Sequence, residues 1–482
     1  HGYIRHAEYV GESRNYLLHE LVLVPQIWRL QNRQDCRIFQ EMRTPDIIQQ
    51  VLVEAGVPSD KFRFDLTGTY APRNYCVQYR ETDLDFISRL LEEDGIFYFF
   101  EHTAEKHVLV MADKAGAHPP IPGNPVLWFN PPGGFVNDRE HVDAFRFGQS
   151  VRPGRVSLRD YYFPKPDENM EVKEESDRDV ELEVYDYPGE YRSPDRGAPD
   201  RGATIARTRL EALQVPRRLG NGSSDCMRLV AGNTFTLQAH PAIELNRAYK
   251  LVRVVHHAAQ PQVLDEDASG EFSYHNEFVC MESSVPFRPA RVTPRPFVRG
   301  IQSATVVGPS GEEIHTDEQG RVKVQFHWDR RGTHNENSSC WIRVSQLWAG
   351  PGWGAMFLPR IGHEVLVDFI EGDPDRPIVT GRVYHGLNDT PYPLPQEKTK
   401  STIKSDSSLG GGGFNEFRYE DRKGDEQVFL HAERNLDIWV KNDRMEAIRH
   451  DRHLIVGDTV NGGKVGTKCE EVKLDKHVKV HR

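Results

Sequence analysis

Residues 362–385 read GHEVLVDFIEGDPDRPIVTGRVYH, a stretch that either folds into a sharp β-hairpin or gathers carboxylates around a metal or a substrate. Residues 364–370 alternate in side-chain direction, as in a barrel strand with one buried face. Residues 371–377 hold one glycine and two prolines, which supply the φ angles that a turn needs. Residues 378–384 return as a second strand, so the stretch predicts a hairpin. The face of its first strand that we expect to be buried holds Val365, Val367 and Phe369.

A calcium or catalytic site is the alternative for this hairpin, because five carboxylates crowd it. They are Glu364, Asp368, Glu371, Asp373 and Asp375. The EF-hand pattern D-x-[DN]-x-[DN]-G is absent, and so is the glutamate that ends such a loop. Glu364 and Asp368 share a strand face but lie too far apart to chelate one ion readily. We therefore expect a structural hairpin whose acidic tip lies in water, with Arg376 offsetting the charge, and no metal site.

The surrounding residues 300–385 have the pattern of a small barrel. The segment GRVKVQFHWD alternates strictly, with Val322, Val324, Phe326 and Trp328 on one face. Further short apolar segments follow, separated by turns rich in glycine and proline. Short strands at this spacing over fewer than 100 residues indicate a small antiparallel barrel.

Residues 1–290, before this barrel, mix helices and strands. Residues 44–56 predict a helix capped by Thr44, and residues 82–95 predict a helix capped by Thr82. The other elements that we expect here are a strand over 96–101, a helix over 203–215 and a strand over 245–259. The segment VPFRPARVTPRPFVRG (285–300) contains four prolines, which fix φ and remove backbone donors. We expect it to be an extended linker.

The residues after the barrel carry a different period. Val440, Ile448 and Val456 lie eight residues apart, and Val472 and Val480 resume that spacing. A fixed short period is typical of a β-solenoid or an intertwined β-helix. One apolar position per unit cannot build a core alone, so we infer a homo-oligomer in which identical chains wind together. The alternative is that a few valines coincide by chance in a β-rich tail.

The bulk composition limits the possible functions. With 482 residues the chain is long enough for several domains, and its net charge of −11 argues against a general nucleic-acid binder. Residues 297–390 hold 9 Lys and Arg against 12 Asp and Glu, which is unfavourable for an oligonucleotide-binding barrel surface. No stretch is long enough to span a membrane, and HGYIRHAEYV is not a signal peptide. Because this start lacks Met, we expect upstream residues to be missing.

The motifs of common enzymes are absent from the sequence. No H-E-x-x-H or G-x-S-x-G occurs, and GDTVNGGKV (457–465) lacks the Ser or Thr of a P-loop. His256 and His257 are adjacent on an expected strand, so they point to opposite faces and cannot bind one metal. The six cysteines are far apart, which favours reduced thiols made in the cytoplasm. We predict no catalytic residues, no cofactor and no metal, and hence no enzyme.

The order of these parts resembles VgrG, the spike protein of bacterial type VI secretion. The resemblance covers nearly the whole chain and rests on long phrases: CRIFQEMRTPDII, YCVQYRETDLDFISRLLEEDGIFYFFEH and VYDYPGEY in the first part, and SCWIRVSQLWAG and PRIGHEVLVDFIEGDPDRPIVTGRVY in the barrel. GGGGFNE and the period of eight follow. VgrG is in turn similar to the hub and spike proteins of contractile-tailed phages, fused into one chain.

This resemblance implies a mechanical function. Three chains would form a hub of tube-like β-barrels that docks on the Hcp tube, followed by OB-fold barrels and an intertwined triple-stranded β-helix. A PAAR-repeat protein would tip this needle, and effector proteins would travel with it through a target membrane. The protein would be made in the cytoplasm and then secreted or injected. Because the chain starts inside the first hub domain and ends in mid-repeat, we expect a longer full-length needle.

The fold class that we predict is therefore mainly β with an α+β hub. The predicted domains are a hub at 1–290, an OB-fold barrel at 291–390, a connector at 391–430 and the start of the needle at 431–482. The needle core is predicted to hold Val440, Ile448, Val456, Val472 and Val480. The alternative function is a trimeric tailspike-like enzyme that acts on surface polysaccharide. Units of eight residues give coils too narrow for the groove that such an enzyme needs.

Overall fold

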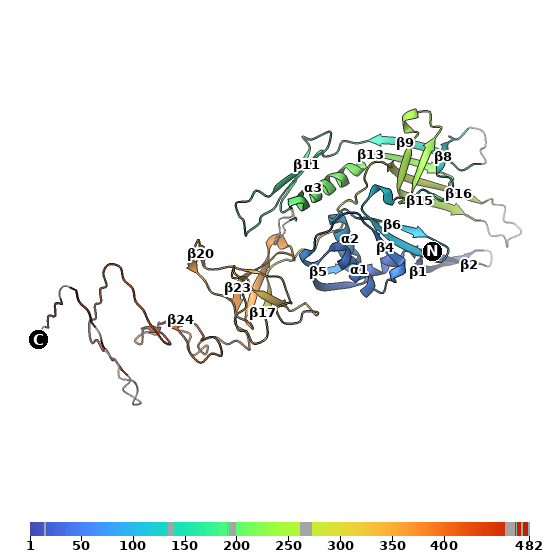
Figure 1. Cartoon of the computed structure of the whole chain (residues 1–482). Coiled ribbons are helices and arrows are strands. Elements are labelled where there is room, and N and C mark those ends of the chain that lie inside the picture. Colours follow the sequence, from blue (N-terminus) through green and yellow to red (C-terminus); the bar gives the residue numbers. More distant parts are fainter. Residues whose placement is uncertain are drawn as a thin grey trace. The chain divides into compact units, whose positions relative to one another are not determined.

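The computed structural model describes residues 1–13, 16–133, 139–189, 191, 199–260, 272–457, 468, 470–473 and 476–480. The chain forms two compact units, His1–Thr390 and Pro391–Arg482 (Figure 1). No helix in the described ranges is long and apolar enough to cross a membrane. Five cysteines lie in these ranges, and all five are free thiols.

The first part of unit 1 packs two helices between short sheets. A β-hairpin comes first, an antiparallel pair β3–β5 follows, and a sheet in the order β4–β7–β6 completes this part. The strands are β1 (Tyr3–Ser13), β2 (Tyr16–Val24), β3 (Gln34–Met42), β4 (Phe62–Asp65), β5 (Arg73–Thr82), β6 (Phe97–His102) and β7 (His107–Ala112). The helices are α1 (Thr44–Glu54) and α2 (Asp83–Glu93), with 3₁₀ turns η1 (Gln26–Asn32), η2 (Ser59–Lys61) and η3 (Ala115–Ala117).

The helices agree with the sequence prediction except for one cap. Thr82 caps α2 as predicted, since its hydroxyl accepts a hydrogen bond from the backbone of Asp85 at 3.0 Å. Thr44 is not the N-cap of α1; that position belongs to Arg43. The Thr44 hydroxyl instead accepts a hydrogen bond from Arg73 Nε at 2.8 Å. The side chain is therefore used to position a buried arginine and not to cap its own helix.

A closed barrel forms the second part of unit 1, in the strand order β13–β16–β15–β14–β8–β9. Its strands are β8 (Val126–Phe129), β9 (His141–Gln149), β13 (Arg218–Ser224), β14 (Thr234–Gln238), β15 (Ala248–Ala259) and β16 (Ser273–Glu282). Phe145 and Phe278 fill its interior. They leave no room for side chains at two positions of β13: a Cβ on Gly220 would come within 2.7 Å of Phe145, and one on Gly222 within 2.4 Å of Phe278. This is the tube-like barrel that the fold prediction expected.

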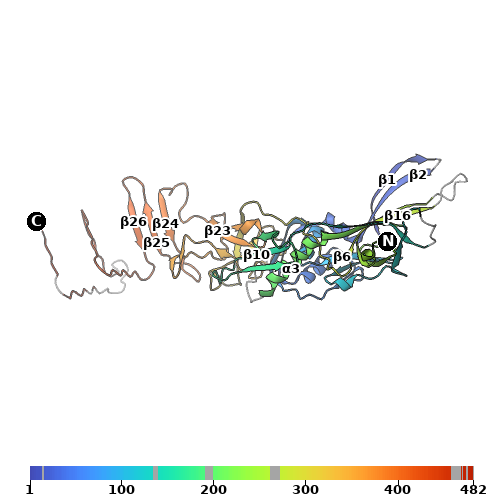
Figure 2. The same ribbon diagram turned by 90° about the horizontal axis from the view of Figure 1, so that it is seen from above.

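A smaller layer flanks the barrel. Helix α3 (Pro199–Gln214) packs against a sheet in the order β11–β10–β12 (Figure 2). Its strands are β10 (Arg155–Arg159), β11 (Glu171–Glu175) and β12 (Glu183–Asp186). The 3₁₀ turns η4 (Val215–Arg217) and η5 (Ile243–Leu245) lie nearby in the chain. The core of this layer contains Val156, Leu158 and Leu210. The helix predicted over 203–215 is thus present and starts four residues earlier.

The last part of unit 1 is a five-stranded sheet in the order β18–β17–β22–β23–β19, with a separate hairpin β20–β21. Its strands are β17 (Gln302–Val307), β18 (Lys323–Phe326), β19 (Arg343–Val344), β20 (Trp348–Gly350), β21 (Trp353–Ala355), β22 (Glu364–Phe369) and β23 (Pro377–Val383). The 3₁₀ turn η6 (Ile370–Gly372) lies between the last two. The two predicted apolar faces, 322–328 and 365–369, do meet in one core, although Trp328 is only partly buried.

Unit 2 begins with a three-stranded antiparallel sheet of β24 (Lys400–Lys404), β25 (Glu416–Glu420) and β26 (Gln427–His431). This sheet lies inside the segment 391–430, for which the sequence suggested only a polar connector. Residues 432–457 form no helix or strand and are almost entirely exposed. Part of the predicted needle, including residues 458–467, lies outside the described residues.

Candidate functional site

The tip of the 362–385 hairpin is packed against the hub and does not lie in water. Residues 364–383 do form the predicted hairpin β22–β23. However, Arg376 is only 9% exposed, and Asp375 Oδ1 accepts a hydrogen bond from the backbone N–H of Val77 on β5 at 2.6 Å. The predicted solvent-exposed acidic tip is therefore wrong. Contacts with the hub have replaced water as the partner of these charges.

A glycine allows the close approach of the tip. Gly372 has a φ of +68°, and a Cβ at this position would lie 2.3 Å from the ring of Phe297. The carbonyl of Gly372 accepts a hydrogen bond from the backbone N–H of Val298 at 2.8 Å. Only glycine fits here, because it combines the left-handed backbone with an absent side chain. The tip is thus fixed to the end of the proline-rich linker.

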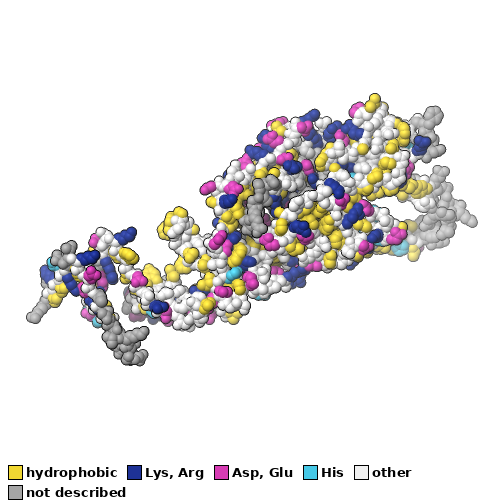
Figure 3. All heavy atoms as spheres, in the orientation of Figure 1, with side chains coloured by type: hydrophobic (Ala, Val, Ile, Leu, Met, Phe, Trp, Pro, Cys, Tyr) yellow, Lys and Arg dark blue, Asp and Glu magenta, His cyan; other side chains and the backbone are white. Residues whose placement is uncertain are grey.

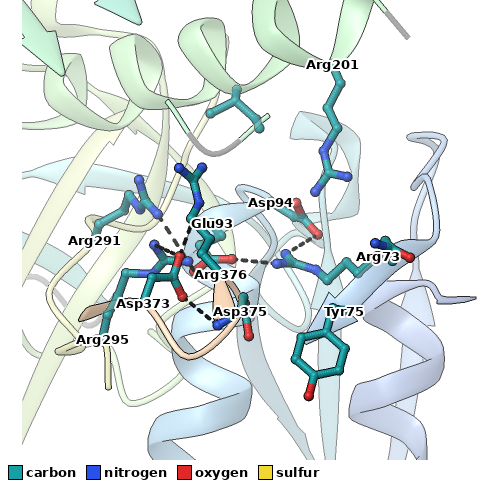
Figure 4. A pocket seen from close by; sticks show the side chains of 12 residues that line it. Arg73, Tyr75, Glu93, Asp94, Arg201, Arg291, Arg295, Asp373, Asp375 and Arg376 are labelled. Carbon is teal, nitrogen blue, oxygen red and sulfur yellow. Dashed lines mark hydrogen bonds and ion pairs between the residues drawn. The ribbon is translucent and has the colours of Figure 1, made fainter. Parts of the chain in front are cut away.

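A charged cavity of about 100 Å³ lies where the tip, the linker and the hub meet (Figure 4). Strand β5, the end of α2, the start of α3, the linker and the hairpin tip all contribute to it. Its lining consists of Arg73, Asn74, Tyr75, Glu93, Asp94, Arg201, Ile205, Arg291, Arg295, Asp373, Asp375 and Arg376. Five arginines thus face four carboxylates. We refer to this region as the joint.

Glu93 is the centre of the charge network in the joint. Its carboxylate is 2.8 Å from Arg73 Nη1 and 3.0 Å from Arg295 Nη2, and Arg89 lies 3.7 Å away. Burial alone would raise its pKa, but the guanidinium groups of Arg295, Arg73 and Arg89 hold the pKa of Glu93 well below its usual range. One carboxylate therefore ties α2 to both β5 and the linker.

The two aspartates at the tip behave differently. Asp373 lies 3.5 Å from Arg376 Nε, and Arg376 Nη2 lies 3.3 Å from the buried Asp160. Burial raises the pKa of Asp375 to about 7, and the neighbouring Asp373 adds to this effect. Near neutral pH the Asp375 carboxyl is therefore partly protonated, whereas free aspartate would be ionised.

A second set of contacts holds the OB-type sheet to helix α1 and strand β5. Arg331 donates two hydrogen bonds of 2.9 Å to the carboxylate of Glu54, whose pKa is thereby lowered to about 2. Tyr79 packs edge-on against Trp328, with ring centroids 5.7 Å apart. Gln302 donates to the Tyr79 hydroxyl at 2.9 Å. The hub and the sheet are therefore joined on two sides.

The linker predicted at 285–300 is extended but firmly held. Glu92 accepts hydrogen bonds from the backbone and hydroxyl of Thr293, at 3.0 and 2.7 Å. Arg288 donates to the carbonyls of Gly95 and Asp113, at 3.0 and 2.7 Å. The linker is therefore bound to the hub through these contacts and to the hairpin tip through Val298 and Gly372.

The joint has the properties of a mechanical connection. Its acidic and basic groups are engaged mainly with one another, and the described residues contain no group of three His, Cys, Asp or Glu that could hold a metal. Bidentate and shared arginine–carboxylate pairs fix distance and angle together. Such a connection holds the hub and the barrel sheet in a fixed arrangement.

The predicted needle residues are all exposed in the single chain. Val440, Ile448, Val456 and Val472 are 45–49% exposed, and Val480 is 83% exposed. None of them lies in a strand. Their inward orientation in an assembly stays a prediction. Trp439 and Met445, which fall outside the period of eight, are more exposed, at 92% and 91%.

A second apolar surface lies on the β20–β21 hairpin and the residues after it. Figure 3 shows hydrophobic side chains gathered on this projection. Trp348 and Trp353 meet edge-on with ring centroids 5.0 Å apart, yet both stay more than half exposed. Leu347 and Met356 are 88% and 75% exposed. Exposed apolar groups of this kind mark surfaces that another protein covers.

Family models cover most of the chain. Residues 1–262 match the model for the phage tail baseplate hub (GPD). Residues 307–384 match the OB domain of type VI secretion system and phage-baseplate injectors. Residues 401–482 match the C-terminal trimerisation domain of bacteriophage T4 gp5. The fold and these matches define the class: a phage-tail-like hub fused to an injector OB domain and a trimerisation segment.

Relatives in bacteria identify the family within that class. The type VI secretion system spike protein VgrG1c of Pseudomonas aeruginosa is 44% identical over 458 residues, which cover 94% of this chain and 62% of that protein. VgrG1a of the same organism is 43% identical over 456 residues and 70% of its length. VgrG3 of Vibrio cholerae is 39% identical, with 44% of its length covered. The chain belongs to the VgrG family of type VI secretion spike proteins, and these relatives are named as spikes rather than as enzymes.

Solved structures show the same fold. The E. coli c3393 protein, described as a type VI secretion component similar to T4 gp27 and gp5, matches with a TM-score of 0.54 at 24% identity. The match covers 80% of this chain and 83% of that one. A Francisella PdpA–VgrG complex matches with a TM-score of 0.51 at 8% identity, over 86% of this chain and 65% of that one.

Proposed function

We propose that this chain forms the trimeric spike at the tip of a type VI secretion tube, where it pierces a target membrane by a passive mechanism. The chain spans 62% of the length of the VgrG1c relative, so the activity of the whole protein is part of the proposal. The spike performs no chemistry in this scheme. Contraction of the apparatus supplies the work, and the spike transmits it.

One observation carries the trimer. Residues 401–482 match a trimerisation domain, and the apolar side chains repeated there every eight residues are at least 45% exposed in the single chain. A segment with no apolar interior of its own gains stability only when copies cover its exposed side chains. The exposed tryptophans of β20 and β21 support a contact between copies in the OB domain as well.

Docking on the Hcp tube and carriage of effectors belong to this proposal. The closed six-stranded barrel of the hub supports docking on a tube of similar barrels. The Francisella complex pairs a VgrG with the protein PdpA, which supports binding of further proteins at a spike. A PAAR-repeat protein would close the needle tip. The protein would be made in the cytoplasm, assembled on the apparatus and then secreted or injected.

The short distance between the OB domain and the needle supports a passive function. Only residues 385–400 separate the two family matches. A folded catalytic domain needs at least about 50 residues, so no lysozyme-like domain fits at this place. The joint provides the other requirement of a passive device, a rigid path for force between hub and barrel.

The proposal is tested by the absolute mass of the purified chain, measured by light scattering behind a sizing column. A mass of three chains that does not fall on tenfold dilution is expected. A monomer would contradict the proposed assembly for this chain. A variant with Trp348 and Trp353 both changed to Ser tests the OB contact separately, since loss of trimer there would place that surface between copies.

A further inference from the structure

More guanidinium groups than carboxylates line the cavity in the joint. Five guanidinium groups and four carboxylates line it. Asp160 lies outside the lining but pairs with Arg376, so the remaining excess of positive charge is at most about one, and it arises because Asp375 is partly protonated near neutral pH. Arginine is effectively always protonated, which means that the protein itself cannot remove this excess.

Arg201 is the lining arginine for which the described part of the chain supplies no partner. It extends from α3 into the cavity toward Arg73 and Asp94 (Figure 4). Among the described residues it forms no hydrogen bond or ion pair. Burial lowers its pKa and the charge of Arg73 lowers it further, whereas Asp94 and Glu93, which already pair with Arg73, raise it. A buried cation beside a second cation is costly unless an anion joins them.

Arg73 has donors left for such an anion. It donates to Thr44, Glu93 and Asp94, at 2.8, 2.8 and 3.2 Å. A guanidinium carries five N–H groups, so two of them remain. The free donors of Arg73 and Arg201 face the same cavity. Planar guanidinium forks of this kind suit tetrahedral oxyanions.

The size of the cavity limits the ligand. At about 100 Å³ it has room for roughly three water molecules of about 30 Å³ each, or for one small polyatomic ion in their place. Pockets for drug-sized ligands and nucleotides begin at about 300 Å³. The site therefore fits a free small anion better than the phosphate of a larger molecule.

We propose that the joint binds one small tetrahedral oxyanion, such as inorganic phosphate, between Arg73 and Arg201. The anion connects strand β5 to helix α3 at the point where the linker and the OB hairpin meet them. It would neutralise the charge of Arg201 and stabilise the joint. The proposal does not depend on the spike function.

The test compares phosphate with sodium chloride at equal ionic strength and pH 7.5. Thermal unfolding and calorimetric titration with inorganic phosphate are measured for the whole chain, for Arg201→Gln and for Arg43→Gln. Arg43 is a matched control because its guanidinium is 58% exposed and pairs with Asp46 on the surface. Phosphate should raise the melting temperature of the wild type and of R43Q. R201Q should bind phosphate at least tenfold more weakly.

A purely structural role for Arg201 gives a different result. Because Arg201 has no partner in the described part of the chain, R201Q should be as stable as the wild type, or more stable, when phosphate is absent. Lower stability of R201Q in chloride, or an unchanged phosphate response, would overturn the proposal. Equal stabilisation of the wild type by phosphate and chloride would also overturn it. Arg201→Lys keeps the charge without the fork and should bind with intermediate affinity; ATP should bind no better than phosphate.

Discussion

The joint and the needle segment differ in where their side chains find partners. In the joint, most of the charged side chains from five separate segments pair with one another inside a single chain. In the needle segment, apolar side chains are left exposed, at 45–83% for the five predicted core positions. The first region is complete in one copy, whereas the second needs other copies. Under the proposed function the protein uses both, a rigid connection within each chain and a core shared between chains.

The two regions also differ in how they are stabilised. The joint relies on buried arginine–carboxylate pairs, which lose much stability when one partner is removed. The needle relies on apolar burial, which is nondirectional and becomes available only on association. Substitutions that remove one partner of a charge pair should therefore damage the joint, and substitutions that add a charge should damage the needle.

The largest effect is expected for Ile448→Asp in the needle. In a trimer this change places three carboxylates near one axis, and each unpaired buried charge costs several kcal/mol. The mass measured by light scattering should fall from three chains toward one. Met445→Asp is the control, because Met445 is 91% exposed and falls outside the period of eight. A trimer that tolerates I448D would show that the predicted inward register is wrong.

In the joint, Glu93→Gln should have the largest effect. The change leaves Arg73, Arg89 and Arg295 without their shared carboxylate, a loss of about 3–5 kcal/mol in the free energy of unfolding. Urea denaturation at constant pH measures this loss. Glu101→Gln is the matched control, since Glu101 pairs with Arg63 at a site where both side chains are more than a third exposed. That change should cost less than about 1 kcal/mol.

Gly372→Ala tests the close contact at the hairpin tip. The left-handed backbone costs an alanine about 1–2 kcal/mol, and the clash with Phe297 adds about 1–3 kcal/mol. Gly311→Ala separates these two contributions, because Gly311 has a φ of +88° and open space around its Cβ position. The double variant G372A with Phe297→Ala should recover the part due to the clash. Equal unfolding free energies for G372A and G311A would mean that the contact with Phe297 is not important.

The sequence analysis could find the needle period because that pattern is local. It missed the joint because the joint depends on contacts between distant residues. A period of eight is a local pattern, and the valines report it without knowledge of the rest of the chain. The joint depends on Asp375 meeting Val77 and on Arg376 meeting Asp160, contacts that link residues about 300 and 200 positions apart. Because five carboxylates crowd the hairpin, the sequence predicted an acidic turn exposed to solvent. Only Gly372 between two rigid segments gave a local sign of a fixed position.

The helix caps show the same limit on a smaller scale. Thr82 has its hydrogen-bond partner three residues away, and its predicted cap is present. Thr44 has the same local signal, but Arg73 takes its hydroxyl. A tertiary partner thus overrode a local preference where Thr44 holds a buried arginine. Because Arg73 lines the joint, this departure from the local rule points toward its long-range contacts.

The smallest expected effect is the pH dependence that Asp375 gives to the joint. The pKa of this carboxyl is raised from 3.8 to about 7 in the folded chain. Between these values the folded state holds a proton that the unfolded state has released, so stability falls as pH rises and levels off above about 7. Asp375→Asn removes this dependence and keeps an oxygen that can accept from Val77. The wild type should lose about 1 kcal/mol relative to D375N between pH 6 and pH 8.

Urea denaturation of both proteins at several pH values measures that difference directly, because groups that titrate alike in both proteins cancel. The pKa values of Glu54 and Glu93 are lowered in the folded chain. The stability that their ionised forms contribute is therefore lost only when the pH falls to the ordinary pKa of glutamate and below. They therefore cannot mimic a loss between pH 6 and pH 8. A constant difference between wild type and D375N over this range would mean that Asp375 is ionised in the folded joint. The arginines would then already be balanced more fully, which would also weaken the case for a bound oxyanion.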